Sequence, residues 1–175
     1  ELGNAAMITN DIALEATETH FSPVSPPPYM AGAAVVDVDP GTGEITLVDY
    51  AAVVDCGTVI NPALARVQAE GGLVQGIGMT LTEDVIMDKR GRLQTNSFMQ
   101  YRIPTRQDVC DIKVEFAPSY EPTGPYGAKS IGEIVINTPG PAIAEAVHQA
   151  TGVYFRELPI IAEKVYKGLK AKKEE

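Results

Sequence analysis

Several residue types that mark whole classes of protein are scarce in this sequence of 175 residues. It has no tryptophan, two cysteines and 6% aromatic residues. Cys56 and Cys110 belong to no Cys-x-x-Cys or Cys/His spacing, so we expect no zinc site and predict two reduced thiols in a cytoplasmic protein. No stretch approaches 18 uninterrupted apolar residues, so the sequence predicts no membrane-spanning segment.

Positive charge is also scarce. The chain has 14 Lys and Arg against 23 Asp and Glu, which gives a formal net charge of −9. An acidic chain is poorly suited to follow a phosphate backbone, which argues against nucleic acid as a partner. The hydrophobic content of 45% is typical of a globular protein and excludes a disordered chain.

The length fits one domain of ordinary size. Residues 1–31 are interpreted as an incomplete N-terminal segment that ends in a proline-rich connection, and residues 32–175 as the domain that follows it. The prolines within residues 22–29 lack backbone donors, which excludes both a helix and a central strand at this point.

Strand patterns occur in three places. Residues 33–39 and 44–54 are rich in β-formers and are joined by a short Pro/Gly turn, which predicts a hairpin. A second hairpin is expected from residues 82–88 and from residue 93 onward, over a turn at residues 89–92. Residues 112–116 alternate between apolar and charged side chains and are predicted to form another strand.

Helix signals follow the strands. Asn61 and Pro62 are favourable residues for the N-cap and the first position of a helix. A second helix is predicted from Thr138 to about residue 151, ended by Gly152, and a last one from Pro159. Hairpins followed by separated helices indicate the α+β class, with β-hairpins packed against several helices, rather than an alternating βαβ domain.

The first predicted helix has an unusual composition. Gln68 and Gln75 lie seven apart and therefore on one face, where their amides either bind a ligand or pack with hydrogen bonds to backbone. A glycine within a helix costs about 1 kcal/mol relative to alanine, so another helix or a ligand is expected to approach this backbone closely. The glycines concerned are Gly71, Gly72, Gly76 and Gly78.

The loop of residues 124–133 carries the clearest chemical signal. It is not a P-loop, because Ala128 and Thr123 occupy the positions where a P-loop requires glycine. Its backbone N–H groups can surround an anionic or polar cofactor. Glu133 precedes the apolar run 134–136, where partial desolvation would suit a general base. The alternative is that Glu133 caps a turn and points to solvent.

Three motifs occur in order at residues 54–62 (VDCGTVINP), 68–78 (QAEGGLVQGIG) and 127–133 (GAKSIGE). With supporting segments around residues 101–104 and 139–147, the chain resembles the C-terminal part of the molybdenum-binding subunit of the xanthine dehydrogenase and aldehyde oxidoreductase family. The resemblance covers about residues 12–166. It implies a molybdenum-cofactor-binding type of fold.

The resemblance also implies a molybdopterin-dependent oxidoreductase, with molybdenum-molybdopterin as cofactor. Glu133 matches the base that deprotonates a hydroxide on molybdenum, whose oxygen attacks a carbon of an aldehyde or N-heterocycle. Gln68 matches a residue that contacts molybdopterin, and no side chain is assigned as a metal ligand. The other cofactor-binding residues implied lie in the loop: Lys129, Ser130, Ile131 and Gly132.

Subunits of this family are several times longer than 175 residues. The resemblance therefore implies a fragment or subunit that is inactive alone. Its expected partners are the remaining N-terminal part of the molybdenum subunit, an iron–sulfur subunit with [2Fe–2S] clusters and a subunit with FAD. The alternative hypothesis is a non-catalytic cofactor-binding or assembly module of such a complex.

Overall fold

The computed structural model describes residues 1, 3–5, 8 and 16–174. Its strands form one mixed sheet in the order β1 (Tyr29–Val38), β2 (Ile45–Asp55) and β3 (Ile112–Phe116). β1 and β2 pair antiparallel as a hairpin, whereas β2 and β3 pair parallel, with Tyr50 opposite Ile112. A parallel pair requires a long crossover, and here the crossover contains a helix.

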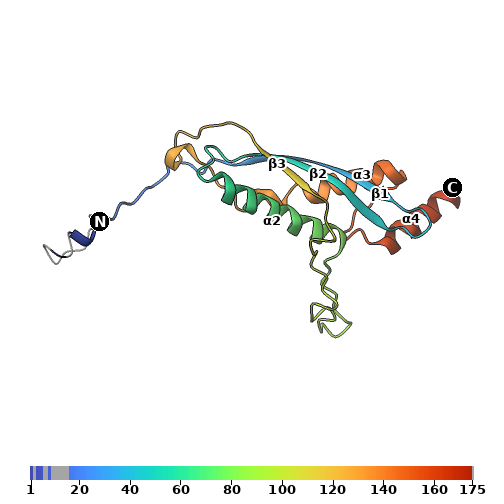
Figure 1. Cartoon of the computed structure of the whole chain (residues 1–175). Helices are drawn as coiled ribbons and strands as arrows, with labels where there is room; N and C mark the ends of the chain where they lie inside the picture. Colours follow the sequence, from blue (N-terminus) through green and yellow to red (C-terminus); the bar gives the residue numbers. More distant parts are fainter. Residues whose placement is uncertain (2, 6–7, 9–15, 175) are drawn as a thin grey trace.

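The helices are α2 (Pro62–Leu81), α3 (Pro139–Thr151) and α4 (Ala162–Glu174), with two 3₁₀ turns, η1 (Pro125–Gly127) and η2 (Ile134–Ile136). Figure 1 shows α2 running along the sheet. Burial alternates along the strands, so that one sheet face packs on the helices. Side chains from the sheet and all three helices share one core: Leu47, Tyr50, Val54, Leu73, Ile77, Ile143, Val147 and Val165.

Three predictions that depend on local signals are confirmed. The β1–β2 hairpin forms, Asn61 caps α2 by accepting a hydrogen bond from the Leu64 N–H at 3.1 Å, and α3 ends at Gly152 in the left-handed conformation. The α+β class is confirmed as well. α4 begins at Ala162 instead of Pro159, because the Ile160 N–H bonds to the Thr80 carbonyl of α2 at 2.7 Å.

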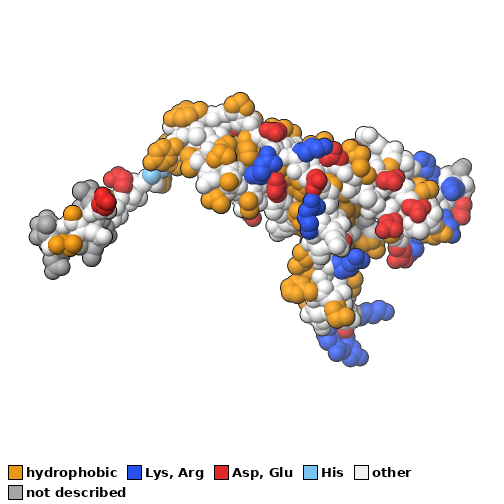
Figure 2. Space-filling view, in the orientation of Figure 1, with side chains coloured by type: hydrophobic (Ala, Val, Ile, Leu, Met, Phe, Trp, Pro, Cys, Tyr) orange, Lys and Arg blue, Asp and Glu red, His pale blue; other side chains and the backbone are white. Residues whose placement is uncertain are grey.

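Residues 82–104 form an arm that projects from the body of the molecule (Figure 1). The predicted second hairpin is wrong as a pair of strands: the two sides of the arm form an isolated bridge between Met87 and Leu93, flanked by single hydrogen bonds such as the one from the Gln94 N–H to the Ile86 carbonyl at 2.7 Å. An isolated two-stranded ribbon is marginal in water, and no third strand extends this one within the described residues. Figure 2 shows basic side chains gathered at the tip, which are Lys89, Arg90 and Arg92.

The parallel pairing of β3 was not predicted, because it joins strands that are distant in the sequence. The proposed boundary at residues 31 and 32 stays a prediction, and part of the N-terminal segment (residues 2, 6–7 and 9–15) lies outside the described residues. Residues 16–28 contain no helix or strand. No helix among the described residues is long and apolar enough to cross a membrane.

Candidate functional site

The glycine-rich loop is anchored to the end of β2. Lys129 Nζ lies 2.5 Å from Asp55 Oδ2, and only 8% of the lysine side chain and 23% of the aspartate side chain are exposed. The Lys129 N–H also donates to the Cys56 carbonyl at 2.7 Å. The Thr58 N–H donates to the Gly127 carbonyl at 2.8 Å, so backbone and side-chain bonds hold the start of the loop together.

The charge at this anchor is well compensated. The hydrogen bond from Lys129, followed by one from the Ser119 hydroxyl, lowers the pKa of Asp55 to about 2. The Gly57 N–H donates to the same carboxylate at 3.1 Å. Burial raises the pKa of the neighbouring Cys56 thiol. Asp55 is therefore a fixed anion at neutral pH, whereas Cys56 stays a thiol and is not an activated nucleophile.

Beyond the anchor, the loop runs against α2 and leaves a hollow of about 400 Å³, called here the α2–loop hollow. Gln68, Gly71 and Gln75 line it from α2, and Gly132 and Glu133 line it from the loop. The Gln68 Nε2 donates to the Gly132 carbonyl at 3.1 Å, which connects the two walls and leaves the amide oxygen of Gln68 without a partner among the described residues.

Glu133 lies at the rim of this hollow, just before η2. Its side chain makes no capping hydrogen bond, so the alternative role as a turn cap is not supported. It is exposed, however, so the desolvation expected from the apolar run 134–136 is not supplied by this chain. The apolar side chain of Val135 turns into the core instead.

The glycines of α2 are explained by two kinds of surroundings. A Cβ at Gly72 would collide with Val135, and one at Gly76 would lie 2.7 Å from Pro139 Cγ and 2.9 Å from the Ile136 carbonyl oxygen. These residues therefore confirm that another element packs closely on the helix. At Gly71 a Cβ would have no atom within 4 Å, and this open position faces the α2–loop hollow.

The loop also presents free backbone donors. Among the described residues, no acceptor is found for the N–H groups of Ser130, Ile131 and Glu133, whereas the Gly132 N–H bonds to the Ser130 hydroxyl at 3.3 Å. Three of these four residues are exposed, and Ile131 is half-buried. Consecutive unpaired N–H groups form a suitable surface for an anionic or polar group.

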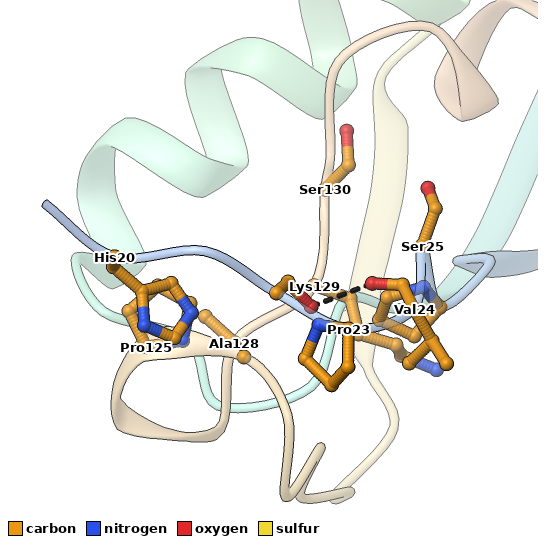
Figure 3. Close-up of a pocket in the computed structure, with 11 residues that line it drawn as sticks. His20, Pro23, Val24, Ser25, Pro125, Ala128, Lys129 and Ser130 are labelled. Atoms are coloured by element: carbon orange, nitrogen blue, oxygen red, sulfur yellow. Dashed lines mark hydrogen bonds between the residues drawn. The ribbon is translucent and has the colours of Figure 1, made fainter.

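A second face of the loop is covered by the proline-rich segment. Figure 3 shows that residues 22–26 and residues 124–130 line one hollow, which has a volume of about 650 Å³. The Ser22 hydroxyl bonds to the Val24 carbonyl at 2.5 Å and lies 3.4 Å from the Thr123 carbonyl. Ser130 borders this hollow, whereas Glu133 borders the α2–loop hollow.

The predicted site residues are thus divided among neighbouring positions. The structure brings Gln68, Gly132 and Glu133 together at the α2–loop hollow. Ile131 borders an adjacent hollow of about 460 Å³, which Gln68 and Gly132 also line. Lys129 differs from the others, because its ammonium group pairs with Asp55 and its N–H donates to the Cys56 carbonyl, although the residue borders two of the hollows.

Sequence reasoning did not single out Asp55. The signal that could have indicated its role is its place in the first family motif, but the lysine that it pairs with lies 74 residues further along the chain. The described residues contain no group of three or more His, Cys, Asp or Glu side chains that could hold a metal ion. Both cysteines are free.

Solved structures show which class of protein has this fold. Quinoline 2-oxidoreductase from Pseudomonas putida superimposes with a TM-score of 0.76 at 37% sequence identity, over 79% of this chain and 18% of that chain. Among curated proteins, a probable hypoxanthine oxidase of Escherichia coli is 39% identical over 158 residues, which is 90% of this chain and 16% of the relative. The gamma subunit of the 6-hydroxypseudooxynicotine dehydrogenase complex of Paenarthrobacter nicotinovorans is 36% identical over 144 residues, which is 79% of this chain and 18% of that subunit.

A family model for the molybdopterin cofactor-binding domain matches residues 1–110. The chain belongs to this family. Its relatives include xanthine dehydrogenase molybdenum-binding subunits and an aldehyde oxidoreductase, which confirms the resemblance found in the motifs. The chain spans less than a fifth of the length of the relatives compared above. The family match ends before residues 127–133, so it does not test the roles assigned to that loop.

The residues of the α2–loop hollow fit a molybdopterin. Such a group needs polar partners and room close to the backbone, and the hollow offers the Gln68 amide oxygen, the N–H group of Glu133 and the open surface at Gly71. No carboxylate other than Glu133 lines it. The residues that would hold the group are therefore neutral donors and acceptors, with one carboxylate at the edge.

Proposed function

We propose that this chain is the C-terminal molybdopterin-binding domain, over residues 32–175, of a molybdenum hydroxylase that oxidises an aldehyde or an N-heterocycle. One observation carries the proposal: in a chain of the molybdopterin-binding family, Glu133 shares a hollow with the amides of Gln68 and Gln75, next to loop residues whose N–H groups have no partner among the described residues. This arrangement combines a potential base with a neutral binding surface.

The bound molybdenum-molybdopterin would supply the redox centre. Gln68, Ser130, Ile131 and Gly132 would hold and orient it through amide and backbone groups, and Glu133 would accept the proton that is released as the substrate is hydroxylated. An exposed carboxylate is a weak base when water surrounds it. The remainder of the protein would therefore cover the hollow and exclude water from Glu133.

The substrate class is supported by the names of the relatives. Hypoxanthine and quinoline are N-heterocycles, and another relative is named as an aldehyde oxidoreductase. Relatives are also subunits of multi-subunit complexes. Electrons taken up at the redox centre must leave it, so iron–sulfur and FAD partner subunits are part of the proposal. The chain is expected to be inactive without the remainder of the molybdenum subunit.

The test is Glu133→Gln in the assembled enzyme, which removes the base but keeps the size and polarity of the side chain. Loss of a general base lowers turnover by about a hundredfold or more. We expect such a loss of hydroxylation rate, with the molybdenum and pterin content per complex unchanged. Glu115→Gln is the matched control, because Glu115 is exposed on β3, outside the hollow.

A loss of less than about tenfold would contradict the role of Glu133 as the base. If the complex contains the cofactor but neither variant nor wild type hydroxylates any aldehyde or N-heterocycle, the alternative applies. The chain would then be a non-catalytic cofactor-binding or assembly module.

A further inference from the structure

The most completely bonded polar group near the site is the Lys129–Asp55 ion pair. Six ion pairs involve described residues. In each of the five besides Lys129–Asp55, at least one of the two side chains is 48% or more exposed. Lys129 is only 8% exposed. Its ammonium group also lies 5.1 Å from the centre of the Tyr29 ring on β1, so it contacts both strands of the hairpin.

This pair lies where the loop joins the sheet. Asp55 is the last residue of β2. Lys129 directly follows Ala128, which forms an isolated bridge with Gly57. The other bonds of the anchor are backbone bonds on either side of the pair and two bonds to the Asp55 carboxylate, from the Ser119 hydroxyl and the Gly57 N–H. The pair therefore fixes both the position and the direction in which the chain leaves the sheet toward residues 130–133.

The residues after Lys129 have few other restraints. Up to η2, the contacts of this segment with the rest of the chain include one side-chain bond, from Gln68 to the Gly132 carbonyl. The Gly132 N–H bonds only within the segment, to Ser130. The far end of the segment is held by the packing of Ile131 against the core and by the hydrogen bond from the Ile136 N–H to the Glu133 carbonyl at 3.2 Å. The anchor holds its start, so a shift at the anchor would move the chain from residue 130 onward toward Glu133.

We propose that the Lys129–Asp55 ion pair is a positioning device, which fixes residues 130–133 and with them Glu133 relative to α2, and that Lys129 does not bind the cofactor. The effect on loop position follows from the anchor itself, whereas its consequence for turnover rests on the proposed function. Lys129 is thus a positioning residue that acts through the loop.

The experiment compares Lys129→Met, Asp55→Asn and the double variant in the complex purified from the native host. Hydrogen exchange followed by mass spectrometry reports, without any turnover, on the amides of residues 127–133 that are hydrogen-bonded, which are those of residues 127–129 and Gly132. We expect exchange in this segment to rise about tenfold in each single variant, because local opening becomes easier. The double variant should add little beyond either single variant, since all three remove the same interaction. Lys129→Arg should restore slow exchange.

Lys113→Met is the matched control. Lys113 of β3 pairs with Asp49, which lies on β2 as Asp55 does, but this pair is in an exposed position. It should leave exchange in residues 127–133 unchanged. The proposal is wrong if Lys129→Met or Asp55→Asn leaves this exchange within about twofold of wild type. Loss of molybdenum with unchanged loop exchange would show that Lys129 acts on the cofactor instead. If Lys129→Met does not accumulate, Asp55→Asn and the double variant decide the question by the same criteria.

Discussion

α2 places glycine in two different surroundings within two turns. At Gly72 and Gly76 the helix backbone is in close contact with Val135, Ile136 and Pro139, whereas at Gly71 there is open space. The same comparison holds for the loop that crosses this helix: its start is fixed by the Lys129–Asp55 pair, and its end carries exposed Glu133. At Gly72, Gly76 and Lys129 the contacts of the site are made within this chain, whereas Gly71 and Glu133 are left open.

The difference shows which features serve the fold and which serve a ligand. Closed positions contribute to the stability of this chain, and changes there should be measurable without any partner. Open positions cost the chain helix propensity or leave polar groups without partners, and nothing within the described residues compensates for this. They therefore point to a group that the complete protein brings to the hollow.

The largest stability effect is expected at the closed glycines. Gly76→Ala would place a methyl group 2.9 Å from the Ile136 carbonyl oxygen and 2.7 Å from Pro139 Cγ, where backbone and ring have little room to move. Overpacking of this kind exceeds the gain in helix propensity, so we expect a loss of about 2 to 3 kcal/mol. Urea denaturation of the chain measures it, as a lower midpoint with an unchanged slope. A stabilised Gly76→Ala variant would contradict the close packing of α2.

The anchor of the loop should show a specific pH dependence. The pKa of Asp55 is lowered from 3.8 to about 2 in the folded chain, chiefly by the hydrogen bond from Lys129. A depressed pKa adds stability that is fully present above pH 3.8 and is lost as the pH falls through about 2. The contribution is about 2 kcal/mol. The advantage of wild type over Asp55→Asn should therefore narrow by this amount between about pH 5 and pH 2.

Denaturation of both proteins at several pH values measures this narrowing. A difference between wild type and Asp55→Asn that stays constant over the whole range would mean that the carboxylate charge of Asp55 does not stabilise the fold.

The smallest effect, and of opposite sign, is expected at the open glycine. Gly71→Ala meets no atom within 4 Å, so it should stabilise the chain by up to about 1 kcal/mol through helix propensity. In the assembled protein the same methyl group would intrude on the hollow and lower the molybdenum content. Denaturation of the chain and metal analysis of the complex test the two parts. Destabilisation comparable to Gly76→Ala would remove the distinction between the open and closed positions.

The elements that the sequence predicts well are those with local signals. The turn between β1 and β2, the N-cap at Asn61 and the left-handed glycine after α3 each act within a few residues. The arm of residues 82–104 has turn residues, but in the part of the chain that the structure describes it has no third strand to pair with, so the local pattern overstated its structure. The parallel pairing of β3 depends on a crossover, which local patterns do not specify.

The same distinction applies to the site. Gln68 and Glu133 could be singled out because helix spacing and a glycine-rich loop are visible in the sequence, although their approach to one hollow required the structure. The Lys129–Asp55 pair could not be predicted from spacing, because its two members come from the end of a strand and from a distant loop. The exposure of Glu133 was also missed, since Ile134 and Val135 pack inward without covering it.

The central claim is that the open side of α2 and its loop hold a molybdenum cofactor within a larger enzyme. The most direct measurement is the molybdenum and pterin content, by mass spectrometry, of whatever purifies with this chain from its native host. We predict about one molybdenum per chain, together with a large partner and iron. A chain of 18.7 kDa that purifies alone and without molybdenum would contradict the claim.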